Sequence, residues 1–297
     1  MRKILSFLFR GCAILFLAVM VLWPAGAAAE LSFSFEVDGK YEDNVIGLTA
    51  DNPNISGGYR GGLAGGGMSL KGGMTNTPGM GGAGTGGGTQ TQGDYSTNLY
   101  ADIGSDHDLA EATSLLFLLS AEHRSYSKFN DFDFTIGTLS AGISHRFSET
   151  FSGTFWLNAS VEDFKATARD STAYGASASL KERLSDPFWL KQTIDIEYST
   201  ATSSLYSYTG ISAAIRAGYD LSDSQQVSVG YSYLVRDFKN SIPAFKLTSQ
   251  VVSLYWTLDL NDAWTVLAGY DHELADSNIP NTATNNNIYT VGIQYAY

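Results

Sequence analysis

The sequence predicts an all-β fold, a transmembrane up-and-down antiparallel β-barrel of about twelve strands that follows an N-terminal signal peptide. Three observations support this prediction. Large apolar or aromatic residues alternate with small or polar residues in a series of separate segments, and this is the side-chain period of a β-strand. The connections between the segments alternate between short turns and longer loops. After the first 29 residues, no run of about twenty apolar residues remains that would form a spanning helix.

The N-terminal segment has the features of a secretory signal peptide. Arg2 and Lys3 supply the charged start, and an apolar stretch leads to the small residues 27–29, which form an A-x-A cleavage site. An uncleaved anchor helix is the alternative, but the small-residue tail favours a peptidase site. We therefore expect a signal peptide at 1–29 and a barrel domain at 30–297.

The charge balance and the cysteine content argue against several classes of function. The chain has 18 basic and 30 acidic residues and a net charge of -12, which argues against nucleic-acid binding, because that requires clustered Lys and Arg. Cys12 is the only cysteine and leaves with the signal peptide, so the mature chain forms no disulfide and no cysteine metal site. The histidines form no metal-ligand cluster, and the Gly-rich stretch lacks the ending of a phosphate-binding loop. We expect no metal and no cofactor.

The alternating segments begin directly after the predicted cleavage site. In the first of them, Leu31, Phe33 and Phe35 lie on one face, and Glu36 and Asp38 lie on the other. A soluble β-sandwich would place such a polar face in bulk water, whereas in a barrel it lines the lumen. An even number of strands closes an up-and-down barrel with both termini on one side. The predicted strands are 31–41, 95–104, 114–126, 134–147, 151–162, 173–183, 189–200, 211–220, 227–236, 252–259, 264–271 and 287–297.

The last strand has the clearest alternation. Its large residues stand at every second position: Tyr289, Val291, Ile293, Tyr295 and Tyr297. This strand ends on an aromatic residue and resembles the final strand of bacterial outer-membrane β-barrels of the porin-like families. The resemblance implies that the protein lies in the outer membrane, contacts its lipid, and presents these residues as the signal that the barrel-assembly machinery reads. The stretch Y-E-D-N-V at 41–45 also resembles the start of several porin-like barrel families.

Short and long connections alternate along the chain. Turn-forming residues make the short links, which are 148–150, 185–187, 222–224 and 261–262. The longer connections are 51–93, 125–132, 165–172, 201–208, 240–246 and 276–286. Short turns at one rim and longer loops at the other are typical of membrane barrels. Aromatic residues also gather near the strand ends, as in interfacial girdles: Phe147, Phe151, Phe188, Trp189, Tyr219, Trp264, Tyr295 and Tyr297.

Two stretches depart from the regular pattern. Residues 51–93 are rich in glycine and too poor in apolar surface to offset the loss of chain entropy, so we expect a flexible loop there. This loop is either a plug folded into the pore or an unconstrained external loop. In the segment 134–147 the alternation changes phase near Thr138, which predicts a β-bulge.

The charged residues on the polar faces of the strands form the candidate lumen. In a narrow barrel, opposed charges set a transverse field that selects small polar or charged solutes. We therefore predict a porin-like channel that passes small hydrophilic solutes by passive diffusion. The alternative is a non-conducting structural, adhesive or export-accessory barrel, in which these residues pair across a tight lumen. The candidate lumen residues are Glu36, Asp38, Lys40, Glu122, Arg124, Arg146, Glu162, Lys181, Arg183, Lys191, Asp195, Glu197, Arg216, Arg236, Asp259, Asp271 and Glu273.

A further alternative is a lipid hydrolase. His123 and Ser125 lie two residues apart, on one face of a strand near its outer end, and a hydroxyl beside an imidazole is the minimum for acyl transfer. The pair resembles that of outer-membrane phospholipase, in which such a Ser and His face lipid. An orienting Asn or Asp on the neighbouring strand is not evident, because Asn130, Asp131 and Asp133 lie in the loop. We expect a protein that is not an enzyme.

Overall fold

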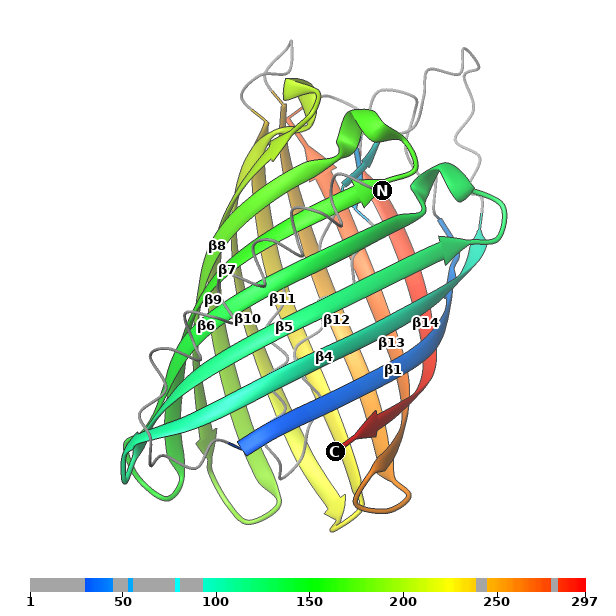
Figure 1. Ribbon diagram of the computed structural model, residues 1–297. Coiled ribbons are helices and arrows are strands. Elements are labelled where there is room, and N and C mark those ends of the chain that lie inside the picture. Colours follow the sequence, from blue (N-terminus) through cyan, green and yellow to red (C-terminus); the bar gives the residue numbers. More distant parts are fainter. Residues whose placement is uncertain (1–29, 45–52, 56–77, 81–92, 239–244, 279–282) are drawn as a thin grey trace.

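The computed structural model describes residues 30–44, 53–55, 78–80, 93–238, 245–278 and 283–297. Twelve long strands form a closed barrel (Figure 1). The predicted all-β barrel and its number of strands are confirmed. The strands are β1 (Glu30–Glu42), β4 (Asp94–Ala110), β5 (Thr113–Tyr126), β6 (Phe134–Arg146), β7 (Phe151–Phe164), β8 (Ser171–Arg183), β9 (Phe188–Ala201), β10 (Tyr208–Ser222), β11 (Gln225–Phe238), β12 (Phe245–Asp259), β13 (Trp264–Ser277) and β14 (Thr284–Ala296).

Every strand of the barrel pairs with its neighbours in antiparallel fashion, and the first strand closes the sheet against the last. Val37 of β1 lies across from Ile293 of β14 on one side and from Leu99 of β4 on the other. A closed sheet has no free edge, so its backbone N–H and C=O groups are hydrogen-bonded between strands, as a lipid environment requires.

The two rims of the barrel differ as expected. The short turns lie at one end, where β1 begins and β14 ends (Figure 1). The loops that carry three one-turn 3-10 helices lie at the other end; these helices are η1 (Asn130–Phe132), η2 (Thr167–Arg169) and η3 (Ser204–Tyr206). Two short strands, β2 (Pro53–Ile55) and β3 (Pro78–Met80), pair with each other in a separate sheet. No helix among the described residues is long and apolar enough to cross a membrane.

The two faces of the barrel have opposite polarity. Large apolar side chains are exposed on the outer face; Leu31 is 71% exposed and Val291 is 66% exposed. The inner face carries buried Ser, Thr, Asn and charged residues on every strand of the barrel. A soluble protein has the reverse arrangement, so this outer surface fits a protein that is surrounded by lipid.

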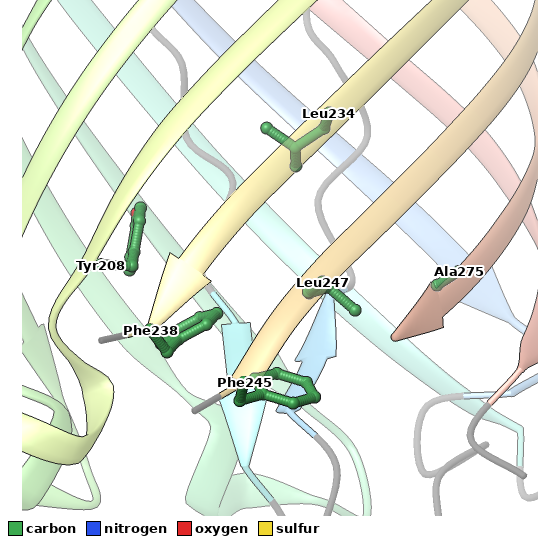
Figure 2. Close-up of a cluster of buried hydrophobic side chains, with 6 residues drawn as sticks. All are labelled: Tyr208, Leu234, Phe238, Phe245, Leu247 and Ala275. Carbon is green, nitrogen blue, oxygen red and sulfur yellow. The ribbon is translucent and has the colours of Figure 1, made fainter. Parts of the chain in front are cut away.

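The inner face also holds apolar clusters, which the sequence analysis did not anticipate. Figure 2 shows the largest, at the loop end of β10 to β13; it consists of Tyr208, Leu234, Phe238, Phe245, Leu247 and Ala275. A second cluster joins Leu116 and Leu118 of β5 to Trp156 of β7. Alternation shows which residues share a face, but large residues on both faces weaken that signal.

The predicted β-bulge near Thr138 is wrong. Strand β6 pairs with β5 and β7 without a shift of register. The change of phase arises because Phe134 and Ile136 point inward and pack with Phe164 of β7, whereas Ile143 further along β6 is exposed on the outer face. The backbone continues regularly, and only the face that carries the large residues changes.

The predicted aromatic girdle needs one correction and one addition. Trp189 points inward and is only 5% exposed; a Cβ on Gly218 of the next strand would overlap its ring, so this contact requires glycine. At the loop end of the barrel, four tyrosines form a continuous row across the seam between the first and last strands. The ring centroids of Tyr41 (β1) and Tyr95 (β4) are 4.8 Å apart, and those of Tyr41 and Tyr289 (β14) are 6.3 Å apart. The row continues to Tyr270 of β13, whose ring centroid lies 5.3 Å from that of Tyr289.

Two predictions concern residues that are not described. The signal peptide at 1–29 lies entirely outside the described residues, and so does the Gly-rich loop 51–93 apart from β2, β3 and residue 93. Both stay predictions.

Candidate functional site

Most of the predicted lumen residues lie on the inner face of the barrel. Three of the predicted set, Arg146, Arg183 and Asp259, are exposed at the short-turn rim instead. There Arg146 donates a hydrogen bond to the carbonyl oxygen of Glu111 at 3.2 Å, and Asp259 accepts one from Thr265 at 2.6 Å. The residues that are buried or half-buried inside the barrel are Glu36, Asp38, Lys40, Glu122, Arg124, Glu162, Lys181, Lys191, Asp195, Glu197, Arg216, Arg236, Asp271 and Glu273.

Acidic side chains concentrate on the inner face of β1, β4 and β5, which we call the acidic wall. It consists of Glu36, Asp38, Glu42, Asp94, Asp102 and Glu122. The carboxylate of Asp38 accepts a hydrogen bond from Asn98 at 3.2 Å, and that of Asp102 accepts one from Ser34 at 2.5 Å. The sequence analysis missed Glu42, Asp94 and Asp102, although all three continue the inward phase of their strands.

Like Lys40, Arg124 is a buried cation on the strands of the acidic wall. Its side chain is 2% exposed, and its guanidinium lies 3.4 Å from the carboxylate of Glu122 and 5.2 Å from the centre of the Phe134 ring. The carboxylate of Glu42, from β1, accepts a hydrogen bond from the hydroxyl of Tyr126 at 3.3 Å. The charges on this wall are therefore held by contacts within β5 and between β5 and β1.

A second buried pair lies between β9 and β11. The guanidinium of Arg236 is 4.0 Å from the carboxylate of Glu197 and 4.5 Å from the ring centre of Tyr208. The hydroxyl of Tyr208 donates a hydrogen bond to the same carboxylate. Arg236 thereby joins the polar lumen to the apolar cluster of Figure 2, which includes Tyr208.

Three basic residues stand side by side on β8, β9 and β10, and we call them the basic ladder. Lys181 lies directly across from Lys191, and Lys191 lies directly across from Arg216. Strand β9 is six strands from β1 in either direction around the ring, so the basic ladder occupies the wall that faces β1. Sequence alternation placed each of these residues inward but did not show that they adjoin.

The outer face carries a polar group at the loop end of β5 and β6. The hydroxyl of Ser125 lies 2.9 Å from Nε2 of His123, and Nδ1 of that ring lies 2.9 Å from the hydroxyl of Thr135. Thr135 lies across from His123 on the neighbouring strand and, on its other side, across from Asp163 of β7. The partner that the sequence analysis did not find is thus a threonine rather than an Asn or Asp.

The residues of the predicted assembly signal lie on the outer face of β14, except Tyr297, which directly follows this strand. Tyr289, Val291, Ile293 and Tyr297 are exposed, and the ring of Tyr295 packs 5.0 Å from that of Trp264. Recognition of this strand by the assembly machinery stays a prediction. Within the described parts of the chain, no three His, Cys, Asp or Glu side chains form a group that would hold a metal ion.

Comparison with known proteins shows the fold. No protein-family model matches the sequence, and no curated protein matches it. An outer membrane channel from Pseudomonas putida F1 has a TM-score of 0.53 at 12% identity, covering 92% of this chain and 99% of that one. The NanC porin has a TM-score of 0.47 at 8% identity, covering 88% and 98%, and the KdgM porin has 0.42 at 11% identity, covering 88% and 99%. The closed barrel, its apolar outer face and the likeness to the first of these structures place the protein in the bacterial outer membrane.

Proposed function

We propose that this barrel is a porin-like channel that passes small hydrophilic solutes by passive diffusion. The observation that carries the proposal is the charge arrangement of the inner face, where the acidic wall on β1, β4 and β5 faces the basic ladder on β8 to β10. Charges fixed on opposite walls make a transverse field, which orients polar solutes and disfavours apolar ones. A purely structural barrel gains nothing from separating its charges in this way.

Planar-bilayer recording tests the proposal directly. The barrel domain, residues 30–297, is refolded in detergent and added to a planar bilayer. We expect discrete and reproducible current steps that scale linearly with voltage. Heat-dependent migration on a denaturing gel establishes that the barrel has folded. A folded barrel that stays silent at every voltage would contradict the proposal and favour the structural or export-accessory alternative.

The outer face supports a second candidate function, the hydrolysis of lipid esters. With the ring proton on Nδ1, His123 donates to Thr135 and its Nε2 accepts the proton of Ser125. The serine oxygen would attack an ester carbonyl carbon, and the imidazolium would return the proton to the leaving alcohol. Water would then cleave the acyl-serine. The hydrogen bonds among the three side chains favour this candidate.

A serine-reactive probe decides the second candidate. A fluorophosphonate labels an activated serine, so we expect labelling of the refolded protein at Ser125 if the group is catalytic, and loss of label and of ester hydrolysis in Ser125→Ala. Ser127→Ala is the matched control, because Ser127 is exposed two residues further along the chain. Equal labelling of both variants, or no labelling of the wild type, would remove this candidate.

A further inference from the structure

The basic ladder brings three positive charges together inside the barrel. Directly opposed residues on one face of an antiparallel pair have Cβ atoms about 4.5–5.5 Å apart, and the ladder contains two such pairs in succession. Arg216 is only 7% exposed, and Lys181 and Lys191 are half-buried. Like charges in this arrangement repel one another, and partial burial strengthens the repulsion.

The same-face positions directly before and after the three ladder residues carry no carboxylate, and the nearest acid on β10, Asp220, pairs with Arg183 at 3.0 Å. On the strands that flank the ladder, Ser152 of β7 lies directly across from Lys181, and Gly230 of β11 lies directly across from Arg216. The nearest residues of the same face along the strands are Ser179, Arg183, Trp189, Thr193, Ala214 and Gly218. The next acid along β9, Asp195, accepts a hydrogen bond from Ser212 at 3.0 Å. The ladder is therefore a local excess of positive charge within a chain whose net charge is -12.

Aromatic rings support the two ends of the ladder. The ammonium group of Lys181 lies 5.3 Å from the ring centre of Trp189, and the guanidinium of Arg216 lies 5.1 Å from that of Tyr255. The hydroxyl of Tyr255 donates a hydrogen bond to Asp271 at 2.6 Å. These contacts hold the outer two cations in place, and Lys191 lies between them.

We infer that Lys181, Lys191 and Arg216 form a binding site for the oxyanion group of a small solute, either a carboxylate or a phosphate. A negative group between the three cations would relieve their mutual repulsion and form charge-assisted hydrogen bonds with them. Arg216 offers a planar fork for two oxygens, whereas each lysine offers a flexible point charge. The inference deepens the proposed channel function, because it requires a lumen that solutes can enter.

The proposed anion site lies toward one end of the barrel. Lys181 lies near the end of β8 and Lys191 near the start of β9, next to the short turn between them. Arg183, exposed at the same rim, pairs there with Asp220. The site therefore lies close to the short-turn mouth, where it would hold an anion against the acidic character of the rest of the lumen.

Calorimetric titration of the refolded barrel in detergent tests the site without requiring conduction. The probes are citrate, inorganic phosphate and glucose, which supply carboxylates, a phosphate and a neutral hydroxylated solute. We expect citrate or phosphate to bind and glucose not to bind. In Lys181→Gln/Lys191→Gln the anion affinity should fall by about tenfold or more, because each charge-assisted hydrogen bond accounts for about that factor. Lys246→Gln, at an exposed position on β12, should bind as the wild type does.

A stability measurement separates a binding role from a structural one. Removing two of three mutually repelling charges should raise the midpoint of urea unfolding in anion-free buffer, whereas loss of a structural contact should lower it. Binding without current in the bilayer would refute the channel and leave the anion site intact. Current without anion binding, or equal affinity in the double variant and the wild type, would overturn the anion site and leave the channel intact.

Discussion

Replacing Arg124 by Met should lower the free energy of unfolding by about 3–5 kcal/mol, the usual cost of removing one partner from a buried ion pair. The guanidinium lies 3.4 Å from Glu122, and both side chains are almost fully buried, at 2% and 3% exposed. The neutral Met would leave the charge of Glu122 without this compensation on a wall that already carries several other carboxylates. Equilibrium unfolding in urea, followed by tryptophan fluorescence in detergent or lipid vesicles, gives the difference.

Arg146→Met is the matched control for Arg124→Met. Arg146 is exposed at the short-turn rim of the neighbouring strand, where its loss should change the free energy of unfolding by less than about 1 kcal/mol. The double variant Arg124→Met/Glu122→Met should recover part of the loss, since it removes the isolated carboxylate together with its partner. If Arg124→Met is no more destabilising than Arg146→Met, then the pair does not stabilise the barrel.

Replacing Gly218 by Ala should destabilise the barrel by about 1–3 kcal/mol, the range for forcing an extra carbon into a filled space. The added Cβ would overlap the ring of Trp189, which fills the position in front of Gly218 on the neighbouring strand. The indole must then rotate away and lose its position over Lys181. A fall in the urea midpoint, together with a shift of tryptophan emission, would report both effects.

Gly39→Ala is the control for the glycine variant, because a Cβ at that outer position of β1 meets no atom within 4 Å. We expect it to leave the urea midpoint unchanged. In a Trp189→Ala variant, the further change Gly218→Ala should lower the stability of the barrel only slightly, because the overlapping ring is gone. If Gly218→Ala destabilises that variant as much as it destabilises the wild type, then the backbone, and not Trp189, requires glycine.

The sequence was sufficient to predict the strands, because alternation with a period of two is a local property of the chain. Residues such as Val291 and Ile293 follow one another on the outer face whatever strand lies beside them. The same reasoning failed where large residues occupy the inner face. Phe134 and Ile136 pack inside against Phe164, and hydrophobicity alone does not distinguish an inward apolar residue from a break in the strand.

The candidate site was only partly predictable, for a related reason. Alternation placed Lys181, Lys191 and Arg216 inward one at a time, but the residues lie far apart in sequence, and only the register of β8, β9 and β10 makes them neighbours. Register depends on the pairing of whole strands and on the turns that join them. The same holds for Thr135, which reaches His123 only because β5 and β6 pair as they do.

The sequence by itself determined that this protein is a closed membrane barrel, because side-chain alternation, an even number of strands and unequal connections are all present along the chain. The tertiary structure alone decided how charge is distributed inside it. Five strands separate β9 from β1 in either direction around the ring, so the basic ladder faces the wall that begins with Glu36 and Asp38. An electric field across a lumen depends on distances between opposite walls, and these distances exist only once the sheet has closed.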